Sequence, residues 1–125
     1  MKRVIAAIVL ILAVAGFCVF NVVYIENSYN DLKSDIDDIK QSYSSESVEA
    51  AQKKAAEFEE KWVKKEDNLS VFVNHDIIDE LGVSISKLPI YAPLNEELFL
   101  AECKEIEIGL LHMLNDTKIN MHSLF

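Results

Sequence analysis

The chain contains 125 residues, of which 50% are apolar, and it carries a formal net charge of −9 at pH 7. This length corresponds to one ordinary domain and argues against a multi-domain enzyme or a Rossmann or TIM-barrel scaffold. The acidic balance argues against binding to nucleic acid, because phosphate backbones would be repelled. With three Gly and two Pro, the chain is also poor in the turn residues that a β-sandwich needs.

An apolar segment occupies residues 4–25, and Asn21 is its one strongly polar residue. A helix of this length spans about 33 Å, which matches a hydrocarbon core of about 30 Å. Lys2 and Arg3 precede it, and the positive-inside rule keeps them in the cytoplasm. We therefore expect a single-pass anchor at residues 1–25 in the cell membrane and a domain of residues 26–125 outside the cytoplasm.

Two kinds of processing compete with the uncleaved anchor. Ala13-Val14-Ala15 has the small-x-small shape of a signal-peptidase site, but the chain stays apolar well beyond it. Lipoprotein processing at Cys18 would need a small residue just before the cysteine, where Phe17 stands. The uncleaved anchor is the interpretation that we favour.

Apolar residues at heptad spacing continue beyond the membrane segment. They are Ile25, Tyr29, Leu32, Ile36, Ile39 and Tyr43. This a/d pattern predicts that the same helix continues as an amphipathic stalk to about Gln41. The seam can be buried by later helices of the same chain, which is the use that we favour, or by a parallel homodimer.

A second amphipathic helix is predicted over about residues 46–69, after a serine-rich turn that offers N-cap residues. Trp62 has the largest apolar area outside the membrane segment and should anchor the core. Glu57 and Lys61 are spaced for an ion pair along this helix. Its predicted seam is Val48, Ala51, Ala55, Phe58, Trp62, Lys65 and Leu69.

A third helix is expected from about residue 68 or 70 to Lys87, and it could be continuous with the second, because nothing between them compels a break. Pro89 and Pro93 form the clearest helix stop in the chain. The predicted inner face of the third helix consists of Phe72, Ile78, Leu81, Ile85 and Leu88.

A fourth helix is expected to begin near Leu94 or Asn95, because acids follow where the helix dipole favours them. Its predicted core face is Leu94, Leu98, Ala101, Ile108, Leu111 and Leu114, and the tail is expected to pack on the bundle through Ile119, Met121, Leu124 and Phe125. The predicted fold is therefore all-α, with an N-terminal transmembrane helix that continues into an antiparallel three- to four-helix bundle.

The chain has no GxSxG, phosphate-binding glycine loop or HExxH motif. We therefore expect no enzyme, no catalytic residue, no cofactor and no metal site. The best cation candidate is His75 with Asp79, one helical turn apart, and the neighbouring Glu80. These residues fall short of a site unless His112, His122 or a distant acid completes it, so a histidine hydrogen-bonded to an acid is the favoured interpretation.

The two cysteines also lack a chemical role in the sequence. Cys18 lies inside the apolar segment and Cys103 far outside it, so we expect neither a disulfide between them nor a metal site. Glu102 and Glu105 flank Cys103 and are expected to raise its pKa, which disfavours a reactive thiol.

Several segments together resemble a known family. They are Phe58-Glu59-Glu60-Lys61-Trp62, Phe72-Val73-Asn74-His75-Asp76, Ile78-Asp79-Glu80, Leu110-Leu111-His112 and Ile119-Asn120-Met121-His122-Ser123-Leu124-Phe125. With the Lys-Arg start, the apolar span and the acidic stalk, they resemble small single-pass membrane-anchored helical proteins of unknown function from spore-forming Gram-positive bacteria. The resemblance implies a helical domain outside the membrane, no assigned activity, and association with a polytopic membrane protein.

The most specific parts of this resemblance are the Glu-x-Trp step that ends at Trp62 and the pair Asn74-His75. We take these three residues as candidates for a helix junction or a partner contact. Asn and His can tie a helix junction together by hydrogen bonds, and this interpretation leads.

The leading functional hypothesis is a non-catalytic interaction protein or accessory subunit of a membrane or envelope complex. It is anchored through residues 4–25, has a membrane protein as partner, and allows a homodimer as a variant. The alternative is an extracytoplasmic domain that senses a cation or small ligand through His75, Asp79 and Glu80. A hydrolase ranks last, because it would need a cleft with two or more perturbed titratable groups.

Overall fold

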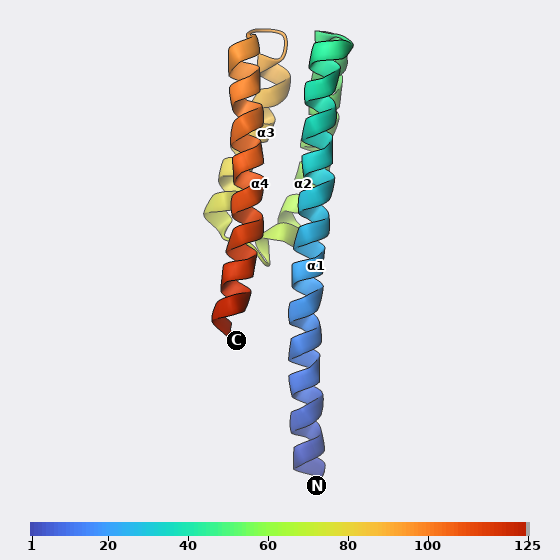
Figure 1. Ribbon diagram of the computed structural model, residues 1–125, viewed down its shortest axis with the longest axis vertical. Coiled ribbons are helices and arrows are strands. Elements are labelled where there is room, and N and C mark those ends of the chain that lie inside the picture. Colours follow the sequence, from blue (N-terminus) through green and yellow to red (C-terminus); the bar gives the residue numbers. More distant parts are fainter. Residues whose placement is uncertain (125) are drawn as a thin grey trace.

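Four long helices make up the described part of the protein (Figure 1). The structure is a computed structural model that describes residues 1–124, with side chains described for residues 1–118. The helices are α1 (Lys2–Ser45), α2 (Val48–Ser70), α3 (His75–Tyr91) and α4 (Glu96–Leu124), and the described part of the chain contains no strand. Each helix packs against the next, and α4 also packs against α1, which closes an antiparallel bundle. The predicted all-α fold is confirmed, with four helices.

The first helix is longer than the bundle, and its N-terminal part projects beyond the other three helices (Figure 1). The large apolar side chains from Val4 to Phe17 are exposed, and Cys18 is the first buried residue of α1. The helix passes residue 25 without a break and ends at Ser45, slightly beyond the predicted Gln41. Its length and composition suit a membrane span, although an N-terminal signal sequence has the same properties. α1 is therefore a candidate membrane anchor.

The seam predicted along α1 lies in the core of the bundle. Ile25, Leu32, Ile36 and Ile39 are at most 1% exposed, and the two seam tyrosines pack against the core while partly exposed. These residues face α2 and α4 of the same chain, because those are the helices that contact α1. The seam is thus buried within one chain, which is the favoured of its two predicted uses.

Side-chain caps separate α1, α2 and α3. Ser47 Oγ accepts a hydrogen bond of 3.0 Å from the amide of Ala50 and begins α2. Asn74 Oδ1 accepts a hydrogen bond of 2.9 Å from the amide of Asp76 and begins α3. The expectation that the second and third helices could be continuous is wrong, because the chain turns between Ser70 and this cap.

Pro89 lies in the last turn of α3, which corrects the prediction that the two prolines together stop the helix. A proline so near the helix end removes one backbone hydrogen bond and leaves the preceding turns intact. The carbonyl of Pro89 also accepts a hydrogen bond of 3.1 Å from Nε2 of Gln52 on α2. The helix ends at Tyr91, and Pro93 follows its C-cap, where proline is common. The fourth helix begins at Glu96, close to the predicted start.

The core face of α4 differs from the predicted one. Most of the predicted face is exposed, namely Leu94, Leu98, Ala101, Ile108 and Leu111, while Leu114 is partly buried. The helix instead buries Phe99, Cys103, Ile106, Leu110 and Met113. Phe99 stacks on Tyr43 of α1, with ring centroids 4.4 Å apart. Because α4 is apolar on two faces, its periodicity alone could not select the buried one.

The expected packing of the tail through Ile119, Met121, Leu124 and Phe125 lies outside the described side chains. The backbone of α4 remains helical to Leu124.

Gly109 allows α4 to pack closely against Leu81 of α3. A Cβ atom at Gly109 would lie 2.6 Å from Leu81 Cδ2 and 3.1 Å from Leu81 Cγ. Leu81 is itself buried, so a Cβ at position 109 would force its side chain out of its packed position. We predict that Gly109→Ala lowers the free energy of unfolding by about 1–3 kcal/mol, although alanine favours the helix by about 1 kcal/mol.

Thermal unfolding of the full-length chain in mild detergent, followed by the fluorescence of its single Trp, measures this effect. Gly16→Ala is the matched control, because no atom lies within 4 Å of a Cβ there. Equal stability of the two variants would contradict the close approach of α3 and α4.

Candidate interaction surface

Ion pairs join α1 to α2 on one side of the apolar seam. Lys61 Nζ of α2 lies 2.7 Å from Asp31 Oδ2 and 2.7 Å from Asp35 Oδ2 of α1. Lys65 Nζ lies 2.9 Å from Asp31 Oδ2. Lys61 therefore bridges two helices instead of pairing with Glu57 along α2, which corrects that part of the sequence interpretation.

These ion pairs shift the pKa values of their members. Hydrogen bonds from Lys61 and Lys65 hold the pKa of Asp31 below its usual value. Burial alone would lower the pKa of Lys61, but the hydrogen bonds to Asp31 and Asp35 outweigh it and raise that pKa. Both shifts favour the charged forms, so the contact is an ion pair at neutral pH.

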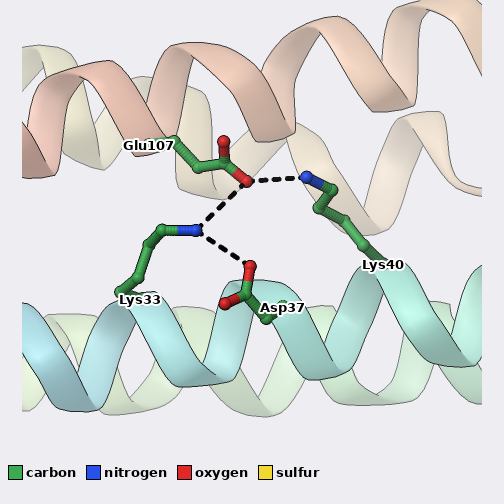
Figure 2. A network of polar contacts seen from close by, with 4 residues as sticks. All are labelled: Lys33, Asp37, Lys40 and Glu107. Atoms are coloured by element: carbon green, nitrogen blue, oxygen red, sulfur yellow. Dashed lines mark hydrogen bonds and ion pairs between the residues drawn. The ribbon is translucent and has the colours of Figure 1, made fainter.

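A second charged network joins α1 to α4 on the other side of the seam (Figure 2). Glu107 Oε1 of α4 lies 2.8 Å from Lys40 Nζ and 3.7 Å from Lys33 Nζ. Lys33 also pairs with Asp37 one turn along α1, at 2.9 Å, and this hydrogen bond raises the pKa of Lys33. The Glu107 side chain is 16% exposed, so its carboxylate is the most buried group of the network.

The three candidate residues from the sequence occupy two different places. Trp62 is 1% exposed, and its Nε1 is buried without a hydrogen-bond partner among the described residues. A Cβ at Gly82 of α3 would lie 3.3 Å from this nitrogen, so Trp62 packs in the core between α2 and α3. Asn74 and His75 lie together at the start of α3, where Asn74 forms the cap and His75 is exposed.

The junction at Asn74 also involves α4. The backbone amide of Asn74 donates a long hydrogen bond of 3.4 Å to Asp116 Oδ2. The turn is therefore tied to both the helix that it begins and the helix that packs beside it. Trp62 is remote from solvent and is not available for direct contact with a partner.

The possible cation site does not assemble among the described residues. His75, Asp79 and Glu80 are all exposed on α3. Within the described side chains, no group of three His, Cys, Asp or Glu is placed to hold a metal ion. His122, named as a possible further ligand, lies outside these side chains.

Both cysteines are buried as free thiols. Burial raises the pKa of Cys103 to about 12. The predicted direction of this shift is confirmed, but its main cause is desolvation by the core, and neighbouring carboxylates add a smaller effect. Cys103 is thus a small apolar core residue at neutral pH.

A groove of about 540 Å³ lies between α3 and α4. Val83 of α3 and Ile108 of α4 line it and are 54% and 45% exposed. Its remaining lining residues are Asp79, Glu80, Leu81, Ser84, Lys87, Glu105, Gly109 and His112. Three carboxylates against one lysine make the lining acidic, while the valine and isoleucine give it an apolar part.

Sequence reasoning assigned Ile108 to the core and did not single out Val83. The signal that could have identified the surface is the second apolar face of α4, since one helix cannot bury both faces in the same bundle. The groove is the candidate interaction surface, because it combines accessible apolar side chains with charges that could select a partner.

The family comparison covers the bundle and the last part of the apolar segment, residues 19–25. The family model named DUF4363, a domain of unknown function, matches residues 19–124. The match begins directly after Cys18, the first buried residue of α1. No curated protein and no solved structure matches the chain.

Asp31→Asn tests the ion pairs between α1 and α2. At pH 7 we expect it to lower the free energy of unfolding by up to about 1 kcal/mol, because the pairs are partly exposed. Since the folded-state pKa of Asp31 is lowered, its contribution is complete above the unfolded pKa of about 3.9 and is lost as pH falls through the folded value. Denaturant titrations at pH 7 and at about pH 2 should show a difference only at the higher pH. A difference that persists in acid would mean that the substitution acts through packing.

Glu107→Gln tests the network between α1 and α4. It leaves Lys33 and Lys40 without their shared carboxylate, so we expect a loss of about 1 kcal/mol in unfolding free energy, which shrinks as salt is added. Asp37→Asn is the control, since Asp37 is more exposed and pairs within α1, and its effect should stay within about 0.5 kcal/mol. Denaturant unfolding at low and high salt measures both, and equal effects would contradict the central place of Glu107.

Proposed function

The chain belongs to the DUF4363 family, a domain of unknown function, and we propose that it is a membrane-anchored, non-catalytic accessory subunit. In this proposal residues 4–25 of α1 cross the cell membrane, Lys2 and Arg3 stay in the cytoplasm, and the bundle lies outside it. The partner is another membrane or envelope protein.

The continuity of α1 is the observation that carries the proposal. One unbroken helix contains both the exposed apolar residues from Val4 to Phe17 and the fully buried seam of the bundle. A helix that is apolar on all sides suits lipid rather than water. A protein bound to the bundle would thus be held at a fixed height above the membrane.

The groove between α3 and α4 is the surface that we assign to the partner. An amphipathic helix with apolar anchors and basic flanks would fit it, because Val83 and Ile108 are accessible beside Asp79, Glu80 and Glu105. A homodimer through the α1 seam would require the bundle to open, because that seam is already buried.

The test is affinity purification of the tagged full-length protein from its native membranes in mild detergent, with mass spectrometry of the proteins recovered. We expect a stoichiometric membrane protein that is lost from the variants Val83→Asp and Ile108→Asp. Val63→Asp is the matched control, because Val63 of α2 is 56% exposed and does not line the groove.

Surface substitutions of this kind change stability by about 0.5 kcal/mol or less, so loss of the partner would report on binding and not on folding. Recovery of the protein alone would contradict the accessory role and favour a ligand-sensing domain. If both groove variants retained the partner, the partner would have to bind another face of the bundle.

A further inference from the structure

The turn between α2 and α3 packs against the apolar segment of α1. The ring centroid of Phe72 lies 6.2 Å from that of Phe17 and 5.9 Å from that of Tyr24. Phe17 and Tyr24 both belong to the apolar residues 4–25. This turn therefore lies beside the apolar segment and not beyond it, and in Figure 1 it is level with the light-blue part of α1.

The length of α1 determines the level of this turn relative to a membrane. Counted from Val4, a helix needs about 20 residues to cross a hydrocarbon core of about 30 Å, and it reaches the far boundary near Val23. Phe17 lies about 9 Å short of this boundary, at 1.5 Å per residue. Tilting of the helix would place still more of its residues inside the core. Since Phe72 contacts both Phe17 and Tyr24, its ring lies close to this boundary, on the hydrocarbon side.

Val71 is the apolar residue of this turn that the protein leaves uncovered. It is 74% exposed, whereas Leu69 and Val73 on either side are at most 5% exposed. Polar residues flank the turn, with Asp67 one helical turn before Val71 and Asp76 in the first turn of α3. An exposed apolar residue with acidic residues on both sides suits shallow contact with acyl chains. The acidic residues provide no electrostatic attraction to anionic lipids.

We propose that the α2–α3 turn inserts Val71 and Phe72 into the outer interface of the membrane that α1 crosses. The turn then adds a contact with lipid to that of the span, which limits how far the bundle can tilt about α1. The occupant of this surface is the upper acyl region of zwitterionic phospholipid. The inference rests on the anchor in the proposed function above, and its test separates the two.

The experiment measures the depth of a fluorescent label on the full-length chain in phosphatidylcholine vesicles. Cys18→Ala and Cys103→Ala remove the native thiols, and a bimane label is attached to Val71→Cys, Val63→Cys or Leu10→Cys. Val63 is the matched control, because it is an exposed valine of α2, the helix that leads into the turn, and lies about 12 Å from Val71 along it. Leu10 lies in the N-terminal half of the span and reports the anchor. The emission of buried Trp62 confirms that each variant is folded.

Nitroxide lipids labelled near the top or near the centre of the acyl chain then serve as quenchers. We expect the label at position 71 to lose most of its emission with the shallow quencher, while position 63 keeps its emission and position 10 responds most to the deep one. This pattern should not change when anionic lipid is added.

Three results would overturn part of the interpretation. If position 10 is quenched and position 71 behaves like position 63, the inserted turn is wrong and the anchor stands. If position 10 is not quenched by either lipid, the proposed anchor itself is wrong. If positions 63 and 71 are quenched equally, the bundle lies along the membrane surface and the depth assigned to the turn is wrong.

Discussion

The order of the helices around α1 depends on the charges that flank its apolar seam. Burial of Leu32 and Ile36 against any amphipathic helix would release similar hydrophobic free energy, so the seam by itself does not choose its neighbours. The charges on either side of the seam determine which helix packs there. Carboxylates of α1 face lysines of α2 on one side, and lysines of α1 face Glu107 of α4 on the other. If α2 and α4 exchanged places beside α1, like charges would face each other. The cost of that repulsion exceeds the small stabilisation that each ion pair gives to the observed arrangement.

The same pairs also fix how far each helix slides along α1. Lys54 contacts Asp38 and Lys61 contacts Asp31, so positions that advance along α2 move back along α1. On the opposite side, Lys118 of α4 lies 3.5 Å from Glu26, and Glu107 contacts Lys40. Apolar side chains tolerate a shift of one turn better than charges do, because several of them can fill similar spaces. The charged pairs therefore set the antiparallel register in which Phe99 meets Tyr43.

Much of this fold could be predicted from the sequence wherever a helix has one apolar face. The buried residues of α2, from Ala51 to Leu69, follow the predicted seam because its other face is charged. The prediction failed for α4, whose leucines and isoleucines occupy two faces, since only the shape and charge of the neighbouring helices select one of them. The break before α3 had a local signal in Asn74 and Asp76, a cap followed by an acid, but it competed with an apolar run that could continue a helix.

The surface identified between α3 and α4 was less predictable than the fold, because it forms where two helices pack together and no sequence motif marks it. Its walls come from residues far apart in sequence, such as Val83 and Ile108, which become neighbours only when α3 and α4 pack. The projecting part of α1 and the exposed apolar face of α4 also differ in kind. The projecting part of α1 is apolar on every side, as lipid requires, whereas α4 is apolar on a side that also carries Lys104 and Glu105. A bilayer would leave these two charges without partners, but a protein surface can pair them, so the all-round surface suits lipid and the one-sided surface suits a protein.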